Sequence, residues 1–559
     1  MRWIPLALAL FLLACGGMAG RVGSKAGSGG ARVGNGGNVN PAGGNMGGAG
    51  GASTTKPTEL DASVNEDVAL DWPSPALPDA AGADAGGLPN IVFILTDDLG
   101  YGDVSLFNPK SKISTPNLDR LGIDGATFRD AHASAAVCTP TRYGLLTGRY
   151  SWRSRLQAGV LWGFDTALIE PDRLTVASLL KQHGYDTAVI GKWHLGMDFA
   201  LHDPPSSTAD PNYPDVDYTK PIQNGPLARG FDYYFGISAS LDMPPYVYIE
   251  NDRFTAVPDV ISYSPAWNPG PLDSTGFAHA EVLGRLAAKA VEYVTSEAGK
   301  PNRPPFFLYL PLTAPHEPIL PLAQFRGKSG AGDYGDFVLE VDTYVGQVLQ
   351  AIDDAGLVSN TLVVLTSDNG PESPAYDVIR EFGHYSMGDW RGIKRDVWEG
   401  GHRVPFLARW PGHIPAGSTS NETICTTDLM ATAAAIVGAQ LPAGAGEDSY
   451  NVLPALLGAT GATPIREATV FIGGGTSYAI RQGPWLFIDT FTGDGNAEPA
   501  WFKDERGYPP DNPAAPGILY DLDHDPQERT DLYPSNTAKA LELKALLDTY
   551  RQSTRSTPP

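Results

Sequence analysis

The sequence predicts an α/β fold, in which a large mixed β-sheet is sandwiched by helices and a smaller C-terminal antiparallel sheet with a helix follows. Two observations predict this fold. From residue 89 onward, short apolar runs typical of buried parallel strands alternate with amphipathic helical segments. From about residue 461, short strands separated by turn residues replace this alternation of strands and helices. We therefore expect a main domain over residues 89–460 and a C-terminal subdomain over residues 461–559.

Four apolar runs are the expected strands of the main sheet, and each leads into polar residues. The runs cover residues 90–95, 185–190, 305–312 and 361–366. They are followed, in the same order, by Asp97 with Asp98, by Lys192 with His194, by His316, and by Asp368 with Asn369. Ligands of open α/β sheets bind at the carboxyl ends of the strands, so these residues are predicted to share one site.

Helices are expected between these strands. One covers residues 173–184 and stops at Gly184, and another covers about 282–294. A third places apolar side chains from Val338 to Ile352 on one face and stops at Gly356.

The C-terminal subdomain is predicted from four short apolar segments and one amphipathic helix. The helix covers about 535–552, and the strands cover residues 468–474, 477–482, 484–490 and 517–522. Turn residues separate the strands, which is typical of an antiparallel sheet.

The N-terminus carries an export pattern. Arg2 is followed by an apolar run over residues 4–14 that is too short to span a bilayer and has the length of a signal peptide. The run ends at Cys15, and this resembles the lipobox of bacterial lipoproteins. We expect a signal peptide over residues 1–15 and a lipid anchor at Cys15, which places the protein in the periplasm or on the cell surface. Ordinary cleavage and secretion is the alternative. Residues 16–88 are rich in Gly, Pro and Ala and are predicted to be a disordered tether.

The charge balance limits the classes of partner. Lys and Arg number 40 against 63 Asp and Glu, a formal net charge of −23. So acidic a surface argues against nucleic acid as a partner, because phosphate binding needs a basic patch. An anionic substrate would need a local positive pocket.

The carboxylates at the strand ends predict a cation. Adjacent acids repel each other unless a cation or hydrogen-bond donors balance them. Oxygen donors without His or Cys favour calcium or magnesium over zinc. Either pair alone is explained as well by a solvated turn or a helix cap. Two pairs at the strand ends of one sheet favour a metal, and the residues are Asp97, Asp98, Asp368 and Asn369.

Basic residues occur in short motifs that follow strands or lie in Gly-rich turns. They are Arg142, Lys192, His194, His316 and Lys394. A metal flanked by such groups suits an oxyanion ester, whose charge must be held while the leaving oxygen is protonated.

The motifs together resemble those of type I sulfatases of the alkaline-phosphatase superfamily. They are "CTPTR" with "LTGR", "ILTDDLGYGD", "GKWHLG", "TAPHEP", "TSDNG", "GIKRDVWEGGHRVPFLARWPG" and "LYDLDHDPQERTDLY", and they extend from about residue 89 to about 550. The resemblance implies hydrolysis of aryl or carbohydrate sulfates. It also implies that a maturation enzyme oxidises Cys138 to formylglycine. One hydroxyl of the hydrated aldehyde would attack sulfur, and deprotonation of the other would expel sulfate.

The resemblance also implies a role for each site residue. Arg142 would hold the diol, while Lys192 and His194 would contact the diol and the sulfate, with His194 as the base. His316 and Lys394 would lie near the bridging oxygen, with His316 as general acid. Ser240 would bind in the substrate site and orient His194. The calcium ligands, with magnesium as the alternative ion, would be Asp97, Asp98, Asp368, Asn369 and residue 138.

Several alternatives stay open on the sequence. The scaffold also suits a phosphate or phosphonate monoester hydrolase, or an inactive lipoprotein that binds sulfated glycans. Cys138 and Cys425 could form a disulfide, although a nucleophile precursor and a buried free thiol are the preferred interpretation. Trp162 could stack on a sugar ring, but a place in the core is favoured. His384 and the pair Asp389 and Trp390 could line a substrate subsite or only pack a loop.

Overall fold

A ten-stranded mixed sheet is the centre of the molecule. The computed structural model describes residues 87–207, 210–264, 267–459, 461 and 463–558. In spatial order the strands are β13 (Ser418–Ser420), β2 (Ala126–Phe128), β12 (Phe406–Arg409), β11 (Thr361–Ser367), β1 (Asn90–Asp97), β10 (Phe306–Pro315), β4 (Asp186–Lys192), β5 (Tyr233–Ile237), β6 (Ile249–Glu250) and β7 (Arg253–Phe254).

The four strands expected from the sequence form the middle of this sheet. They are the neighbours β11, β1, β10 and β4, and all three pairings between them are parallel. In β1, Ile91 pairs with Phe307 on one side and with Leu362 on the other. Because all four strands run the same way, their carboxyl ends meet at one edge of the sheet.

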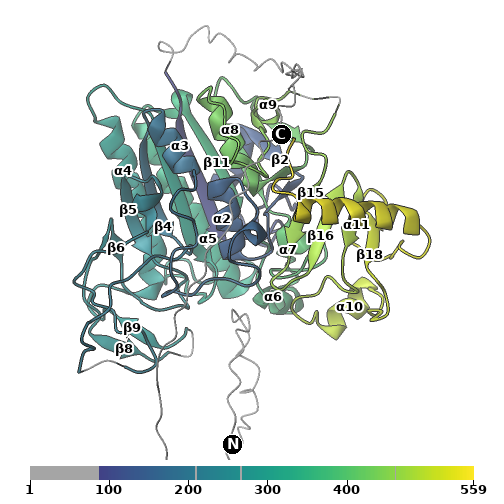
Figure 1. Ribbon diagram of the computed structural model, residues 1–559, viewed down its shortest axis with the longest axis horizontal. Coiled ribbons are helices and arrows are strands. Elements are labelled where there is room, and N and C mark those ends of the chain that lie inside the picture. The colour runs from purple at the N-terminus through teal and green to yellow at the C-terminus, as the bar shows by residue number, and fades with distance from the viewer. Residues whose placement is uncertain (1–86, 208–209, 265–266, 460, 462, 559) are drawn as a thin grey trace, which may run out of the picture. The chain divides into compact units, whose positions relative to one another are not determined.

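Helices cover both faces of the sheet, as expected for an α/β fold (Figure 1). Val92 and Ile94 of β1 belong to a core shared with α4 (Val282–Ala298) and α5 (Gly332–Asp354). Ile91 and Phe93 face the opposite way, because side chains alternate along a strand. They share a second core with three other helices, α2 (Cys138–Thr147), α3 (Val176–Gln182) and α8 (Leu429–Ile436).

Local sequence signals set the limits of α3. Thr175 accepts a hydrogen bond from the backbone N–H of Ser178 and the Ser178 side chain caps in return, so the helix begins later than residue 173. Gly184 has a φ of +85°, the left-handed conformation that a glycine tolerates after a helix end.

The C-terminal part is a separate antiparallel sheet, as predicted. Its strands are β15 (Thr469–Ile472), β16 (Tyr478–Gln482), β17 (Trp485–Ile488) and β18 (Ile518–Asp521), and they pair in sequence order. Helix α11 (Thr537–Gln552) packs on this sheet through Leu543 and Leu547. Figure 1 shows this sheet and α11 beside the large sheet.

Smaller elements complete the described chain. Two short ladders pair β3 (Ala131–His132) with β14 (Ile424–Cys425) and β8 (Val260–Ser262) with β9 (Gly270–Leu272). The remaining helices are α1 (Pro116–Ile123), α6 (Pro374–Phe382), α7 (Glu399–His402), α9 (Leu453–Leu456) and α10 (Ala500–Arg506).

The expected signal peptide, the lipid anchor at Cys15 and nearly all of the tether lie outside the described residues. Within the described segments, none of the helices has the length and apolar character needed to cross a bilayer. The subdomain boundary at about residue 460 stays a prediction.

Candidate active site

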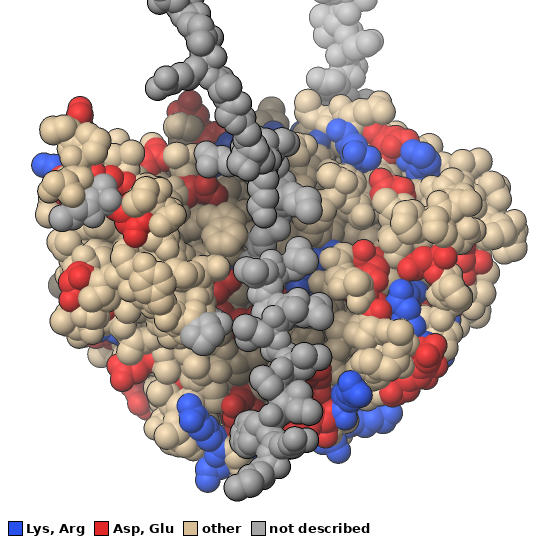
Figure 2. Space-filling view, turned by 90° about the horizontal axis from the view of Figure 1, so that it is seen from below, with Lys and Arg blue, Asp and Glu red and all other residues tan. Residues whose placement is uncertain are grey.

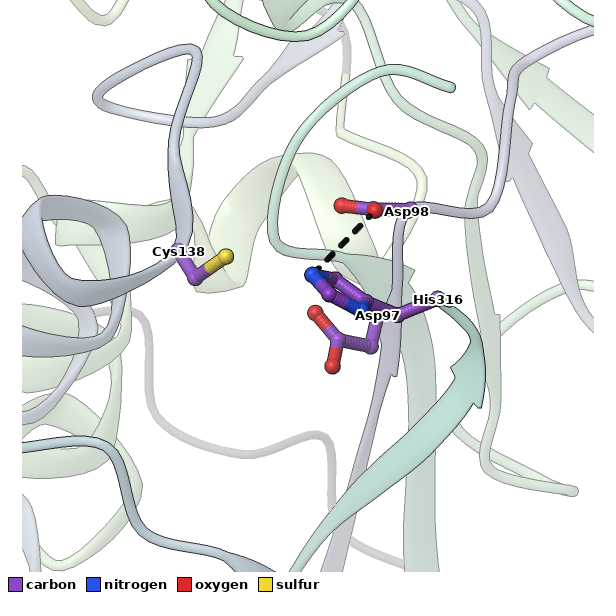
Figure 3. A group of neighbouring side chains, drawn as sticks. All are labelled: Asp97, Asp98, Cys138 and His316. Carbon is purple, nitrogen blue, oxygen red and sulfur yellow. Dashed lines mark ion pairs between the residues drawn. The ribbon is translucent and has the colours of Figure 1, made fainter. Parts of the chain in front are cut away.

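The predicted site residues come together at the carboxyl edge of the sheet. Asp97 ends β1, Lys192 ends β4, and Asp368 directly follows β11. His316 directly follows β10, whose last residue is Pro315. Figure 3 shows Cys138 pointing from the start of α2 toward Asp97, Asp98 and His316. One ligand atom from each of these four residues lies within 4.8 Å of the others.

Three buried ion pairs hold the carboxylates. Lys192 Nζ lies 2.7 Å from Asp97 Oδ2, and Lys394 Nζ lies 2.9 Å from the Asp98 carboxylate. Arg142 donates from Nη2 to Asp368 Oδ2 at 2.7 Å and from Nε to the same oxygen at 3.0 Å. All six side chains are at most 1% exposed. The cations needed for an anionic substrate are therefore placed in the interior of an acidic protein.

The outer surface differs from this interior. On the face in Figure 2, Asp and Glu side chains are interspersed with Lys and Arg. The cations of the site are buried in ion pairs beneath this surface, where a low dielectric strengthens the effect of each charge on a bound anion.

The oxygen donors fit a hard divalent cation. Asp97 Oδ1 and Asn369 Oδ1 are buried and have no hydrogen-bond partner, although unpartnered buried polar atoms are costly. Asn369 donates from Nδ2 to Asp98 Oδ1 at 2.6 Å, which fixes its amide so that Oδ1 is the free acceptor. Carboxylate and amide oxygens are the ligands that calcium and magnesium prefer.

The site perturbs the pKa values of its acids. Burial alone would raise the pKa of Asp97, but Lys192, His316, Arg142 and Lys394 hold it well below the usual value. Burial and the neighbouring Asp97 raise the pKa of Asp368 to about 6 against the opposing effect of Arg142. Asp97 is thus the more strongly ionised of these two carboxylates.

Comparison with known proteins shows the family to which the chain belongs. The sequence model of the sulfatase family matches residues 89–439. The chain belongs to the sulfatase family. It is therefore a sulfuric ester hydrolase, as its motifs predict.

Similar proteins support this membership. An N-acetylgalactosamine-6-O-sulfatase of Bacteroides thetaiotaomicron is 32% identical over 507 residues, which cover 83% of this chain and 93% of the relative. Arylsulfatase A of Bos taurus is 34% identical over 482 residues, which cover 82% and 85% respectively.

Solved structures show the same fold. A Bacteroides thetaiotaomicron protein designated 6S-sulf, from a locus for the metabolism of multiple glycosaminoglycans, superposes with a TM-score of 0.71 at 30% identity. That match covers 84% of this chain and 100% of the other. A Pseudoalteromonas sulfatase gives a TM-score of 0.64 at 22% identity, covering 84% and 92%.

His194 of the sulfatase is held in one tautomer by a backbone carbonyl. Its Nε2 lies 2.7 Å from Leu161 O, so Nε2 carries the proton and donates it. Its Nδ1 is buried and has no hydrogen-bond partner. Burial, Lys192 and Arg142 lower the pKa of His194 well below its usual value, so the ring is neutral with Nδ1 as a free base. Leu161 was not predicted as a site residue, because a backbone carbonyl leaves no signal in the residue type.

Ser240 contacts a different histidine from the one predicted. The sequence analysis pairs it with His194, but its Oγ lies 3.3 Å from His316 Nδ1 in the sulfatase. The same Nδ1 lies 2.7 Å from Glu317 O and donates to it. Strand order alone would favour His194, because Ser240 follows β5 and β5 pairs with β4, which leads to His194. In the structure the carbonyl of Leu161 already orients His194, and the Ser240 hydroxyl reaches His316 instead.

The Nε2 atom of His316 is available to a ligand, because the contacts with Glu317 and Ser240 use Nδ1. It is buried, has no hydrogen-bond partner and lies 3.7 Å from Asp98 Oδ2 (Figure 3). Burial and Lys394 lower the pKa of His316, but Asp98 and Asp97 outweigh them, so the pKa is raised well above its usual value.

Two site residues occupy strained backbone positions. Asp98 has a φ of +64° and His194 a φ of +55°, which non-glycine residues rarely adopt. Such strained conformations persist where surrounding contacts hold them in place, as at catalytic sites. Asp98 is fixed by its N–H, which donates to Asp368 Oδ1 at 3.2 Å.

A second buried cluster combines two histidines with two arginines and two carboxylates. His132 Nδ1 and His402 Nδ1 lie 3.0 Å apart, and Arg403 and Arg481 pair with the adjacent carboxylates of Asp130 and Glu399. Burial lowers the pKa of His402 to about 3, despite the opposing charge of Glu399. Because Arg481 belongs to β16 and Asp130 follows β2, this cluster connects the segment after a strand of the large sheet to the C-terminal sheet.

The residues with open interpretations are also placed. His384 Nε2 lies 2.8 Å from Asp103 Oδ1 and is fully buried, and Arg403 lies over the Trp390 ring, so both pack loops. Cys138 and Cys425 are buried free thiols, as preferred. The expectation that Trp162 lies in the core is wrong, because its side chain is 38% exposed.

Proposed function

We propose that this sulfatase hydrolyses carbohydrate sulfate esters with residue 138, matured from cysteine to formylglycine, as the nucleophile. The observation that carries the proposal is the placement of Cys138 within 4.8 Å of ligand atoms of Asp97, Asp98 and His316. An inert structural thiol would gain nothing from this position, whereas a nucleophile needs acid, base and cation around it.

Two groups supply chemistry that the polypeptide lacks. Formylglycine in its hydrated form supplies a nucleophilic hydroxyl, and a bound Ca²⁺, or Mg²⁺ as the alternative, lowers the pKa of that hydroxyl and stabilises negative charge on the sulfate. The residues that would hold the ion are Asp97, Asp98, Asp368, Asn369 and residue 138. Asp97 Oδ1 and Asn369 Oδ1, which are buried and accept no hydrogen bond, support this assignment.

The chain's own residues divide the remaining work. Lys192 and Lys394 are buried cations that hold the anionic ester and stabilise the charge that develops on its oxygens. Arg142 fixes Asp368 and lies 3.4 Å from Asp97 Oδ1, so it keeps the carboxylates in place beside residue 138.

The two histidines have opposite roles. The free Nδ1 of the neutral His194 accepts a proton from the nucleophilic residue. His316 keeps Nδ1 on the Glu317 carbonyl and directs Nε2 into the site, where it donates a proton to the leaving oxygen. Their tautomers and positions, rather than their order in the sequence, distinguish base from acid.

The substrate class follows from the relatives. The N-acetylgalactosamine-6-O-sulfatase and the 6S-sulf structure share 32% and 30% identity with the chain over most of their length. We take a 6-sulfated amino sugar of a glycosaminoglycan as the preferred substrate.

The experiment compares inorganic sulfate release from N-acetylgalactosamine 6-sulfate and 4-nitrophenyl sulfate with phosphate release from 4-nitrophenyl phosphate. The protein is produced with a formylglycine-forming maturation enzyme, and the peptide that contains residue 138 is examined by mass spectrometry. We expect an aldehyde at residue 138 and faster turnover of the saccharide sulfate, with the Cys138→Ala variant inactive. Faster turnover of the phosphate, or full activity with an intact thiol, would contradict the proposal.

We also propose that the protein is exported and anchored by a lipid at Cys15. The apolar run that ends at Cys15 and the Gly-rich segment behind it support this location. Labelling with a fatty-acid analogue in a bacterial host tests it, and Cys15→Ala is expected to abolish the label and release the protein from membranes. Labelling that persists in Cys15→Ala would contradict the anchor.

A further inference from the structure

Trp162 is an unusual tryptophan in the described part of this chain. Its side chain is 38% exposed, whereas the other tryptophans of the described segments are buried or half-buried. Within those segments, its ring has neither an aromatic nor a cationic partner. An exposed indole leaves a large apolar surface in water, so its position needs a reason.

The backbone beside Trp162 is fixed to the catalytic residues. The Leu161 N–H donates to Thr139 Oγ1 at 3.2 Å, and Leu161 O accepts from His194 Nε2 at 2.7 Å. Thr139 is the neighbour of Cys138 in α2. Adjacent Cα atoms are about 3.8 Å apart, so Trp162 is one residue step from a segment that touches both motifs.

A tight turn holds Trp162 itself. Its N–H donates to Asp165 Oδ2 at 2.6 Å, and its carbonyl accepts from the Asp165 N–H at 3.0 Å. Gly163 packs so closely that a Cβ there would lie 1.8 Å from Pro244 O. The ring is therefore presented from a rigid backbone, which lowers the conformational entropy lost on binding.

The burial of the catalytic groups leaves the ring of the substrate to be bound by other residues. Lys192, Lys394 and His316, which with their carboxylate partners and Arg142 are here called the cup, are at most 2% exposed. A bound sulfate group is therefore buried among them, and we expect the ring that carries it to lie nearer the surface. A sugar ring has an apolar face of C–H groups, and the rigid face of an indole is its usual partner.

We propose that Trp162 is the stacking platform for the ring of the sulfate ester and sets the preference of the enzyme for ring-bearing substrates. The inference rests on the proposed function for its substrate class. It adds a specificity residue that touches the part of the substrate not involved in the chemistry. Asp165 and Gly163 act as positioning residues for the indole.

The experiment uses Trp162→Ala, Trp162→Phe and a control, Leu541→Ala, which removes an exposed apolar side chain from α11. For N-acetylgalactosamine 6-sulfate, Trp162→Ala is expected to raise KM roughly tenfold with kcat within about threefold, and Trp162→Phe to retain most of the affinity. Inorganic sulfate has no ring, so its inhibition constant should be the same in all four proteins.

Calorimetric titration of N-acetylgalactosamine 6-sulfate into the Cys138→Ala protein, with and without Trp162→Ala, gives an affinity that does not depend on turnover. A wild type that releases sulfate and a Trp162→Ala variant with unchanged KM and affinity would overturn this inference alone. Equal losses for the saccharide and for inorganic sulfate would also overturn it, because they indicate a distorted cup. A wild type that binds the sugar through Trp162 but releases no sulfate would overturn the proposed function and leave this inference standing.

Discussion

The Arg142→Met substitution tests whether the buried ion pair between Arg142 and Asp368 stabilises the fold. Arg142 is fully buried, contacts Asp368 through two nitrogens and donates from Nη1 to Lys192 O at 3.1 Å. Met retains most of the apolar stem and removes the charge. Removing one partner of a buried ion pair costs about 3–5 kcal/mol, because the other charge is left uncompensated.

This cost converts into a measurable shift of Tm. At about 2.1 cal/mol/K per residue, 1 kcal/mol corresponds to roughly 1 °C in a fold of this size. We therefore expect Arg142→Met to lower Tm by about 3–5 °C at pH 8 in a chelating buffer. Because the pKa of Asp368 is raised to about 6, this carboxyl already binds protons at pH 5 in the wild type. The difference in Tm between the wild type and Arg142→Met should therefore be smaller at pH 5 than at pH 8.

The matched control is Arg120→Met, which breaks an exposed ion pair. Arg120 lies 2.6 Å from Asp353 and 3.1 Å from Asp124 but is 42% exposed, so its loss should cost at most about 1 kcal/mol. Scanning calorimetry of both variants makes the comparison. A Tm decrease in Arg142→Met no larger than in Arg120→Met would refute the reasoning. The double variant Arg142→Met/Asp368→Asn should recover part of the loss.

Three further predictions follow from the same contacts. His194→Gln removes the free Nδ1 base and should lower kcat about 10²- to 10⁴-fold with little change in KM, measured by sulfate release; an unchanged kcat would remove His194 from the mechanism. Removal of the metal with a chelator should abolish turnover. Ca²⁺ at about 100 times its Kd should stabilise the fold by about 2.7 kcal/mol, which is measured as a higher Tm. An unaltered Tm would argue against a metal site. The pKa of His402 is lowered from 6.5 to about 3, and that of Glu399 from 4.5 to about 2. The unfolded chain therefore takes up protons at a higher pH than the folded protein, and the folded state loses stability as the pH falls below the pKa of each group in the unfolded chain. Tm should therefore fall as pH decreases from 6.5 toward 3, and a flat profile over that range would contradict it.

The centre of the fold was predictable because its signals are local. The run "NIVFIL" is apolar at every position except Asn90, which is typical of a strand buried on both faces, and β1 is flanked by β10 and β11. Helix ends at Gly184 and Gly356 were marked by the residue itself. The edge strands β7 and β13 and the neighbouring β6 were not predicted, because two or three residues carry no periodic pattern.

The site was predictable where side chains follow strands and less so where long-range geometry decides. Asp97, Lys192, His316 and Asp368 follow four neighbouring parallel strands, so topology alone brings them together. The partner of Ser240 depends on how the segment after β5 approaches His316, and the sequence does not indicate this approach. The carbonyl of Leu161 could not be found, because every residue has one.

The charges of the cup give a reason for a metal that does not depend on the relatives. Three carboxylates and three cations form the buried pairs, so their formal charges cancel. These pairs add no net charge, and His316, whose pKa is raised well above its usual value, is then the main positive charge left to attract a sulfate ester. The net charge of −23 on the whole protein opposes that attraction. A divalent ion held by Asp97 Oδ1 and Asn369 Oδ1, which accept no hydrogen bond, would give the same six side chains an excess of two positive charges. Inorganic sulfate should accordingly bind to the calcium-loaded protein and lose most of its affinity when the ion is removed. Equal binding with and without the ion would show that Lys192, Lys394 and Arg142 suffice on their own.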